Sequence, residues 1–119
     1  NKGDALDNLE DYKSAIICYV KAIKINPDYD KAYYNKGCTM HGLECYKDAI
    51  ICYDKVIRIK PNFYKAYYNK GNAIYGLGDY ESAIICYNEV IRINTNFEKA
   101  HCSRKRALGS LNLESTMIS

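Results

Sequence analysis

The chain has 119 residues, 48% of them hydrophobic, and a formal net charge of +3, which together indicate one soluble globular domain. This charge is too small for the clustered basic surface of a nucleic-acid-binding domain, and no apolar run approaches the roughly 20 residues that span a bilayer. The given residues contain no secretory signal pattern. We therefore expect neither a nucleic-acid nor a membrane partner, and a cytoplasmic or nuclear protein in a reducing compartment.

Segments of the chain recur at an interval of 34 residues, which is its most informative feature. Asn-Lys-Gly begins at positions 1, 35 and 69, and Ala-Ile-Ile-Cys-Tyr begins at positions 15, 49 and 83. Pro27 returns as Pro61 and is replaced by Thr95 in the third unit. Repetition in one register at this period predicts a stack of short helical units.

Each unit predicts two helices joined by a turn. The first unit contributes the apolar segment 15–19, and Pro27 follows that segment. In the central unit, steps of three and four residues define two apolar faces: Tyr33, Gly37, Met40 and Leu43, then Ala49, Ile50, Tyr53, Val56 and Ile57. Pro61 ends the second helix because proline cannot continue it. In the third unit Gly76 and Gly78 mark the turn, and Asp79 is a suitable N-cap for the helix that follows.

This pattern resembles the tetratricopeptide repeat (TPR) family, whose 34-residue unit reads W-x2-L-G-x2-Y, A-x3-F and P. The central unit carries the matching series Tyr33, Lys36, Gly37, Met40, Ala49, Tyr53 and Pro61, and the third carries Tyr67, Lys70, Gly71, Ile74, Ala83 and Tyr87. The small residues would let two helices approach closely. The resemblance implies an all-α fold, a right-handed α-solenoid of antiparallel helix hairpins.

The same resemblance predicts where the units begin and end. We expect a TPR domain over 1–112, made of a truncated repeat (1–29), two complete repeats (30–63 and 64–97) and a capping helix (98–112), followed by a partly disordered tail (113–119). The first helix of the truncated repeat would survive only as about Asn1–Leu9, as in a fragment of a larger TPR protein. His101 and Lys105 depart from the repeat pattern, as in a cap whose outer face meets water. Alternatively, a further repeat has been cut away.

Six cysteines and two histidines are the candidates for metal or redox chemistry. Cys18, Cys52 and Cys86 would lie on equivalent helices about 8–10 Å apart, which exceeds the roughly 7 Å between the Cα atoms of a disulfide. We expect them to be packing residues. The group Cys38, His41 and Cys45 has no usual zinc spacing and no evident fourth ligand, and no nucleophile–base arrangement is present. We therefore expect no metal, no cofactor and no enzymatic activity.

A second stripe of side chains follows the first helix of each unit, on a face distinct from the core face. It comprises Lys31, Tyr34, Asn35, Cys38, His41 and Gly42, then Lys65, Tyr68, Asn69, Asn72, Tyr75 and Gly76, then Lys99, Cys102, Ser103, Arg106 and Gly109. The resemblance implies that first helices line the concave surface of the superhelix. The predicted peptide-binding residues are Lys31, Tyr34, Asn35, Lys65, Tyr68, Asn69, Asn72, Tyr75, Lys99 and Arg106.

The chemistry of this stripe favours a peptide as the ligand. The Asn35 and Asn69 amides can both donate to and accept from an extended backbone, tyrosines add flat apolar area, and the basic residues favour an acidic segment or a carboxylate terminus. Asn1, Asn35 and Asn69 recur every 34 residues and form a column of amides, which resembles the asparagine ladder of O-linked N-acetylglucosamine transferases. A structural role, in which Asn ties adjacent repeats together, is compatible with binding.

Chaperone-binding members of the family hold a C-terminal carboxylate with Lys and Asn from one first helix, Asn from the next, and Lys and Arg from a third. In one register these positions hold Tyr34, Cys38, Asn69, Lys99 and Ser103, and in the other Asp4, Asn35, Lys65 and Asn69, with the first Lys position missing. Both sets are incomplete, so we predict no strong binding of chaperone tails.

The leading functional hypothesis is a protein-binding scaffold whose concave groove holds a peptide or helix of another protein. One alternative is a structural module that self-associates into homo-oligomers through exposed repeat ends. Repeat arrays need capping units for solubility, so uncapped ends would pack against one another. Another is a substrate-recruiting region of a larger enzyme, such as a glycosyltransferase.

Overall fold

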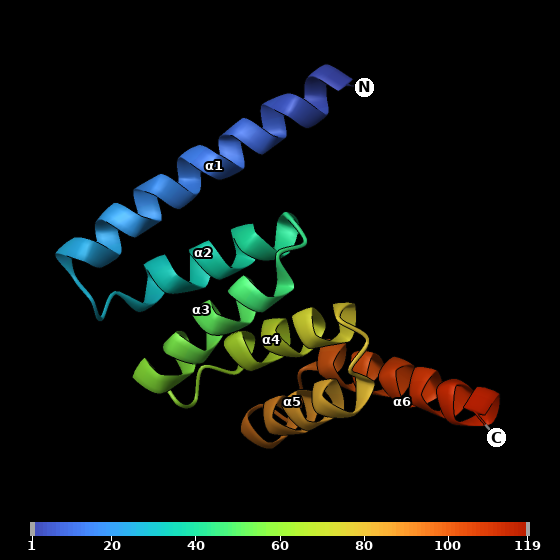
Figure 1. Ribbon diagram of the computed structural model, residues 1–119. Helices are drawn as coiled ribbons and strands as arrows, with labels where there is room; N and C mark the ends of the chain where they lie inside the picture. Colours follow the sequence, from blue (N-terminus) through green and yellow to red (C-terminus); the bar gives the residue numbers. More distant parts are fainter. Residues whose placement is uncertain (1, 119) are drawn as a thin grey trace.

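The computed structural model describes the backbone of residues 2–118 and the side chains of residues 10–113. This part of the chain contains six helices and no strand: α1 (Lys2–Ile25), α2 (Asp30–Gly42), α3 (Tyr46–Ile59), α4 (Tyr64–Gly76), α5 (Tyr80–Ile93) and α6 (Glu98–Ile118). Each helix packs against the next in chain order, so the helices form a stack from one terminus to the other (Figure 1). The predicted all-α repeat solenoid is confirmed.

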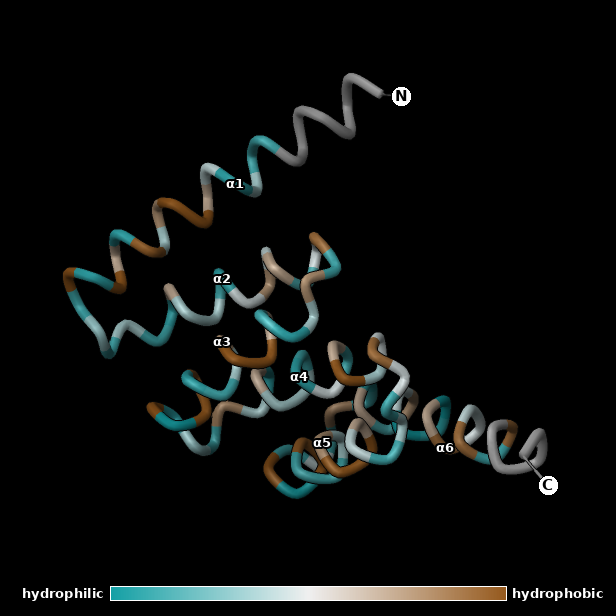
Figure 2. Tube along the Cα trace, viewed as in Figure 1, coloured by the Kyte–Doolittle hydropathy of each residue, from teal (hydrophilic) through white to brown (hydrophobic). Residues whose placement is uncertain are grey.

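Close approach of small and aromatic residues holds each hairpin together. Ala49 and Ala83 are fully buried, and the rings of Tyr53 and Tyr87 are almost completely buried beside them. Hydrophobic and hydrophilic positions alternate along α3 and α5 in Figure 2, as expected of helices with one buried face. The apolar faces predicted from the 34-residue pattern therefore form the core.

The turns inside the two hairpins share one backbone conformation. Glu44 and Gly78 occupy equivalent positions and both have positive φ, 62° and 86°. After the second turn the carboxylate of Asp79 accepts a hydrogen bond from the Ser82 amide at 3.2 Å, which confirms the predicted N-cap. After the first turn Cys45 stands in the N-cap position and makes no side-chain capping bond.

The turns between units do not depend on proline. The Phe63 amide donates to the Lys60 carbonyl at 3.1 Å after Pro61, and the Phe97 amide donates to the Asn94 carbonyl at the same distance, although Thr95 replaces proline there. Local backbone hydrogen bonding is therefore sufficient to end α5.

The first unit differs from the expected hairpin. Instead of a short helix over 1–9 and a turn, α1 runs without a break from Lys2 to Ile25. Glu10 is equivalent to Glu44 and Gly78, so a turn here would place another non-glycine residue at positive φ. A helix as short as 1–9 is not stable without packing, and a continuous helix keeps its backbone hydrogen bonds. The predicted break in the first unit is therefore wrong.

The absence of that hairpin exposes Cys18. Its equivalents Cys52 and Cys86 are buried at 5% and 7% exposure, whereas Cys18 is exposed. Cys86 packs against Gly71 in the first helix of its own hairpin, and α1 has no such partner helix. The prediction of a packing role holds for Cys52 and Cys86 and is wrong for Cys18.

The last helix is longer than predicted. α6 continues to Ile118, beyond the expected end at 112 and through most of the segment expected to be a partly disordered tail. That segment contains neither proline nor glycine, so nothing in it ends a helix.

Among the described residues, no helix combines the length and the apolar character needed to cross a membrane.

Candidate functional site

The first helices of successive units, α2, α4 and α6, lie beside one another and carry all the predicted binding residues. The exposed members of the set are Lys31, Asn35, Lys65, Lys99 and Arg106. The half-buried members are Tyr34, Tyr68, Asn69, Asn72 and Tyr75. The stripe therefore has a basic exposed part and a tyrosine–amide part that is packed into the protein.

Hydrogen bonds link the packed part from one unit to the next. The Asn69 amide donates from Nδ2 to the Tyr34 hydroxyl at 2.8 Å. The hydroxyl of Tyr68 lies 3.4 Å from Ser103 Oγ at the equivalent positions of the next two helices. Asn69 thus ties adjacent repeats together, and the structural role considered for the Asn column is observed at this position.

The rings of Tyr34 and Tyr68 are part of two equivalent aromatic clusters. Tyr34 lies edge-on to Phe63 at 5.2 Å between ring centroids and 6.1 Å from Tyr53. One unit later, Tyr68 lies 5.1 Å from Phe97 and is likewise close to the tyrosine of α5. These contacts give both tyrosines a packing role that the spacing within one helix did not reveal.

A small, shallow cavity of about 200 Å³ that is open to solvent lies between α2 and α4. Its lining residues are Cys38, His41, Tyr53, Asn69 and Asn72. Asn72 Oδ1 accepts a hydrogen bond from the Tyr87 hydroxyl at 2.6 Å, which orients the amide and leaves its Nδ2 as a donor. Burial lowers the pKa of His41, so its imidazole is neutral at pH 7. The cavity is therefore uncharged and offers amide hydrogen-bonding groups.

The first helices also carry exposed positive charges. The guanidinium of Arg106 lies 4.9 Å from the centroid of the Tyr75 ring, a cation–π contact that holds its charge close to α4. The Tyr75 hydroxyl is 3.0 Å from Ser110 Oγ, so α6 is also tied to α4. No carboxylate of residues 10–113 forms an ion pair with Lys31, Lys65 or Lys99.

The positions equivalent to the chaperone clamp are occupied by neutral groups that bind one another. Tyr34 and Cys38 stand where the clamp needs Lys and Asn, and both contact Asn69, the sulfur at 3.8 Å. Ser103 stands where it needs Arg and is buried. Carboxylate-binding groups are therefore missing from three of the five clamp positions.

No group of three potential metal ligands is present in the part of the chain that the structure describes. Cys38, Cys45 and Cys102 are free, exposed thiols, and they occupy three different positions of the 34-residue repeat.

Comparison with protein-family models places the repeat in a known class. A model described as "TPR repeat" matches residues 3–44 and 43–78, and a model described as "Tetratricopeptide repeat" matches residues 64–97. The chain belongs to the tetratricopeptide repeat family. A search of curated proteins finds no match for this TPR chain.

Several solved TPR structures share its fold. The first TPR domain of human RPAP3 is 22% identical, with a TM-score of 0.84 over 97% of this chain and 91% of that one. The first TPR of Spaghetti (RPAP3) bound to the HSP90 peptide SRMEEVD is also 22% identical, with a TM-score of 0.83 over 93% and 88%. The Arabidopsis OM64 TPR domain is 25% identical, with a TM-score of 0.78 over 89% and 88%.

Proposed function

We propose that this TPR domain is a non-enzymatic protein-interaction scaffold that holds an extended acidic segment of a partner protein against α2, α4 and α6. The observation that carries the proposal is the amide-lined cavity between α2 and α4, on helices that also carry an exposed lysine at the same position of each first turn. Amides can bind a peptide backbone whatever its sequence, and the lysines add a preference for acidic side chains.

The residues of the groove would have different roles in binding the peptide. Asn35, Lys65 and Lys99 are exposed and are the groups that a ligand would reach first. Asn72 is oriented by Tyr87 and offers a donor inside the cavity. Asn69 contributes mainly by fixing the spacing between α2 and α4 through Tyr34.

Chaperone tails are not the ligands that this surface suits best, although the related Spaghetti domain was solved with an HSP90 peptide. Tyr34, Cys38 and Ser103 cannot supply the positive charges and the amide that a terminal carboxylate requires. We expect the peptide SRMEEVD to bind weakly, with an internal acidic segment preferred.

The proposal can be tested with peptides selected from a random displayed library on the intact chain. We expect the selected sequences to be enriched in Asp and Glu, and Lys65→Glu to weaken their binding by about tenfold, which corresponds to 1.4 kcal/mol. Fluorescence anisotropy with labelled peptides would give each Kd.

Lys105→Glu is the matched control, because it makes the same charge change at an exposed position of α6 outside the stripe. It should leave Kd within about twofold of the unmodified chain. Equal weakening by both variants would contradict the proposal, since it would mean that only net charge matters.

Self-association is a second candidate function, favoured by the exposed apolar residues of α1. Ile17, Val20 and Ile25 are 55%, 44% and 86% exposed. Sedimentation at increasing concentration would detect it, and a monomer throughout the range would eliminate this candidate.

A further inference from the structure

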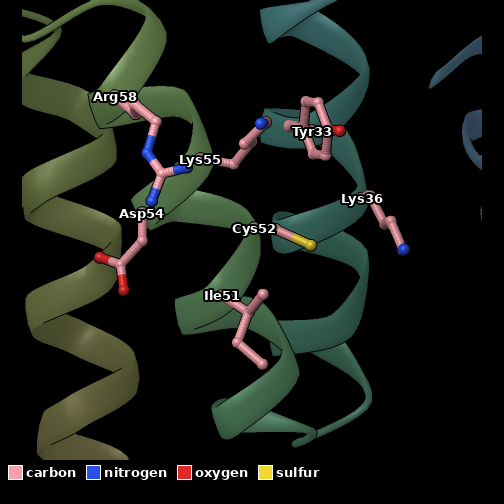
Figure 3. A pocket seen from close by; sticks show the side chains of 7 residues that line it. All are labelled: Tyr33, Lys36, Ile51, Cys52, Asp54, Lys55 and Arg58. Atoms are coloured by element: carbon pink, nitrogen blue, oxygen red, sulfur yellow. The ribbon is translucent and has the colours of Figure 1, made fainter. Parts of the chain in front are cut away.

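A larger open pocket lies between α2 and α3, on the other side of α2 from the cavity just described. It encloses about 450 Å³, and Figure 3 shows the seven side chains that line it: Tyr33, Lys36, Ile51, Cys52, Asp54, Lys55 and Arg58. Helix residues two positions apart point about 200° from each other. Lys36 therefore faces away from Tyr34 and Cys38 and belongs to a surface separate from the proposed groove.

The repeat supplies an internal reference for this pocket, because equivalent residues occur 34 positions later. There, Lys70 forms an ion pair with Asp54 at 2.6 Å, and Arg92 forms an ion pair with Glu89, three residues before it in α5. Both cations of the second site are thus neutralised by carboxylates of the protein.

The first site has the same cations without these carboxylates. Lys36 corresponds to Lys70, but Val20 stands where Asp54 would pair with it. Arg58 corresponds to Arg92, but Lys55 stands in place of Glu89.

The result is an excess of positive charge at the first site. The carboxylate of Asp54 faces its salt bridge with Lys70, and no other carboxylate of residues 10–113 pairs with Lys36, Lys55 or Arg58. The Lys55 ammonium lies 5.9 Å from the centroid of the Tyr33 ring, so one of these charges is held at the pocket wall.

The pocket also offers apolar surface. Ile51 is 67% exposed, as is its repeat equivalent Ile85 at 66%, whereas Cys52, the next residue in the chain, is buried. A ligand that matches both properties carries several negative charges around an apolar group.

We propose that this pocket binds a short acidic segment of a partner protein, with an apolar side chain of that segment placed on Ile51 and its carboxylates paired with Lys36, Lys55 and Arg58. The exposed apolar side chain favours a peptide over a simple anion. This site is independent of the proposed groove, so the TPR domain would hold partner chains on two faces.

The proposal can be tested by adding the capped pentapeptide Glu-Glu-Leu-Glu-Glu to the intact chain labelled with nitrogen-15. We expect saturable amide shifts at Tyr33, at Lys36 and across residues 51–58. Replacement of the central Leu of the peptide by Ser should weaken binding at least threefold, because an apolar contact is lost. Shifts confined to the cavity between α2 and α4 would overturn the inference while leaving the proposed function intact.

Lys55→Glu gives the sharpest variant, since it recreates in α3 the Glu89–Arg92 pair of α5 and so preserves the fold. We expect it to raise the Kd of the pentapeptide at this site at least tenfold, with an unchanged circular dichroism spectrum. Lys65→Glu in the groove and Lys105→Glu on α6 should each leave that Kd within twofold. Equal effects of Lys55→Glu and Lys105→Glu would overturn the inference.

Discussion

Glycine at position 71 sets how closely α4 and α5 approach. A Cβ atom at this position would lie 2.7 Å from a ring carbon of Tyr87 and 3.1 Å from the Cβ of Cys86, both in the core. We expect Gly71→Leu to lower the free energy of unfolding by more than about 1 kcal/mol through overpacking. Urea denaturation followed by circular dichroism would measure the change, and an unchanged midpoint would contradict the assigned packing.

Gly109 provides the control for that substitution, because it also lies within a helix but has no atom within 4 Å of an added Cβ. Gly109→Ala should raise stability by about 0.5–1 kcal/mol, since alanine costs less backbone entropy than glycine in a helix. A loss of stability here would mean that another element covers this face of α6.

The two hairpin turns place different residues at one positive-φ position. Glu44 has positive φ, which a side chain disfavours, and its equivalent is Gly78. We expect Glu44→Gly to raise the free energy of unfolding by about 0.5–1 kcal/mol and Gly78→Ala to lower it by about 1 kcal/mol. Thermal melts would measure the stability of both variants. If both substitutions shifted the melting temperature in the same direction, the prediction would be contradicted.

His41 gives the molecule a pH-dependent term in stability. Burial lowers the pKa of this imidazole in the folded state, so the unfolded state binds more protons as pH falls through about 6.5. The free energy of unfolding should therefore decrease from pH 7 to pH 5.5. His41→Gln should reduce that slope, and an identical slope in both proteins would show that His41 does not contribute.

At the scale of helices, the sequence predicted complete units well and the ends poorly. The 34-residue pattern correctly predicted the hairpins α2–α3 and α4–α5 and the N-cap at Asp79. It missed the continuous α1, because the pattern specifies a turn at the position of Glu10, where the structure has helix. It likewise missed the extension of α6, which nothing in the repeat register specifies.

The candidate site shows the same limit. Helical spacing placed Asn69 and Tyr34 on one stripe, but their hydrogen bond joins two units and depends on how α2 and α4 stack. The sequence shows Lys55 where the next repeat has Glu89. Only the structure shows that Glu89 pairs with Arg92 in α5, and therefore that Arg58 lacks the equivalent carboxylate in α3.

The structure of α1 predicts unequal cysteine reactivity along the stack. In a variant that keeps only Cys18, Cys52 and Cys86, we expect Cys18 to react with a thiol reagent at least about tenfold faster than the other two. Burial raises the pKa of the Cys52 and Cys86 thiols and also restricts access to them. Mass spectrometry of the labelled chain at successive times would give the three rates. If Cys18 reacted as slowly as Cys52 and Cys86, this result would contradict the exposed position of its thiol on α1.

At the scale of the whole molecule, the stack offers two separate surfaces. The first helices present a neutral cavity lined by amides, together with exposed lysines, and the face between α2 and α3 presents a cationic pocket lined in part by an exposed isoleucine. Because α4 and α6 are tied to their neighbours through Tyr34, Tyr68 and Tyr75, we expect the groove to be largely formed before a ligand binds.

The central claim is that α2, α4 and α6 form a peptide-binding groove. It is tested most directly by amide shifts of the nitrogen-15-labelled chain when a library-selected peptide is added. The account predicts saturable shifts around Asn35, Lys65, Asn72 and Lys99, which Lys65→Glu weakens and Lys105→Glu does not. Binding that leaves these amides unshifted would contradict it.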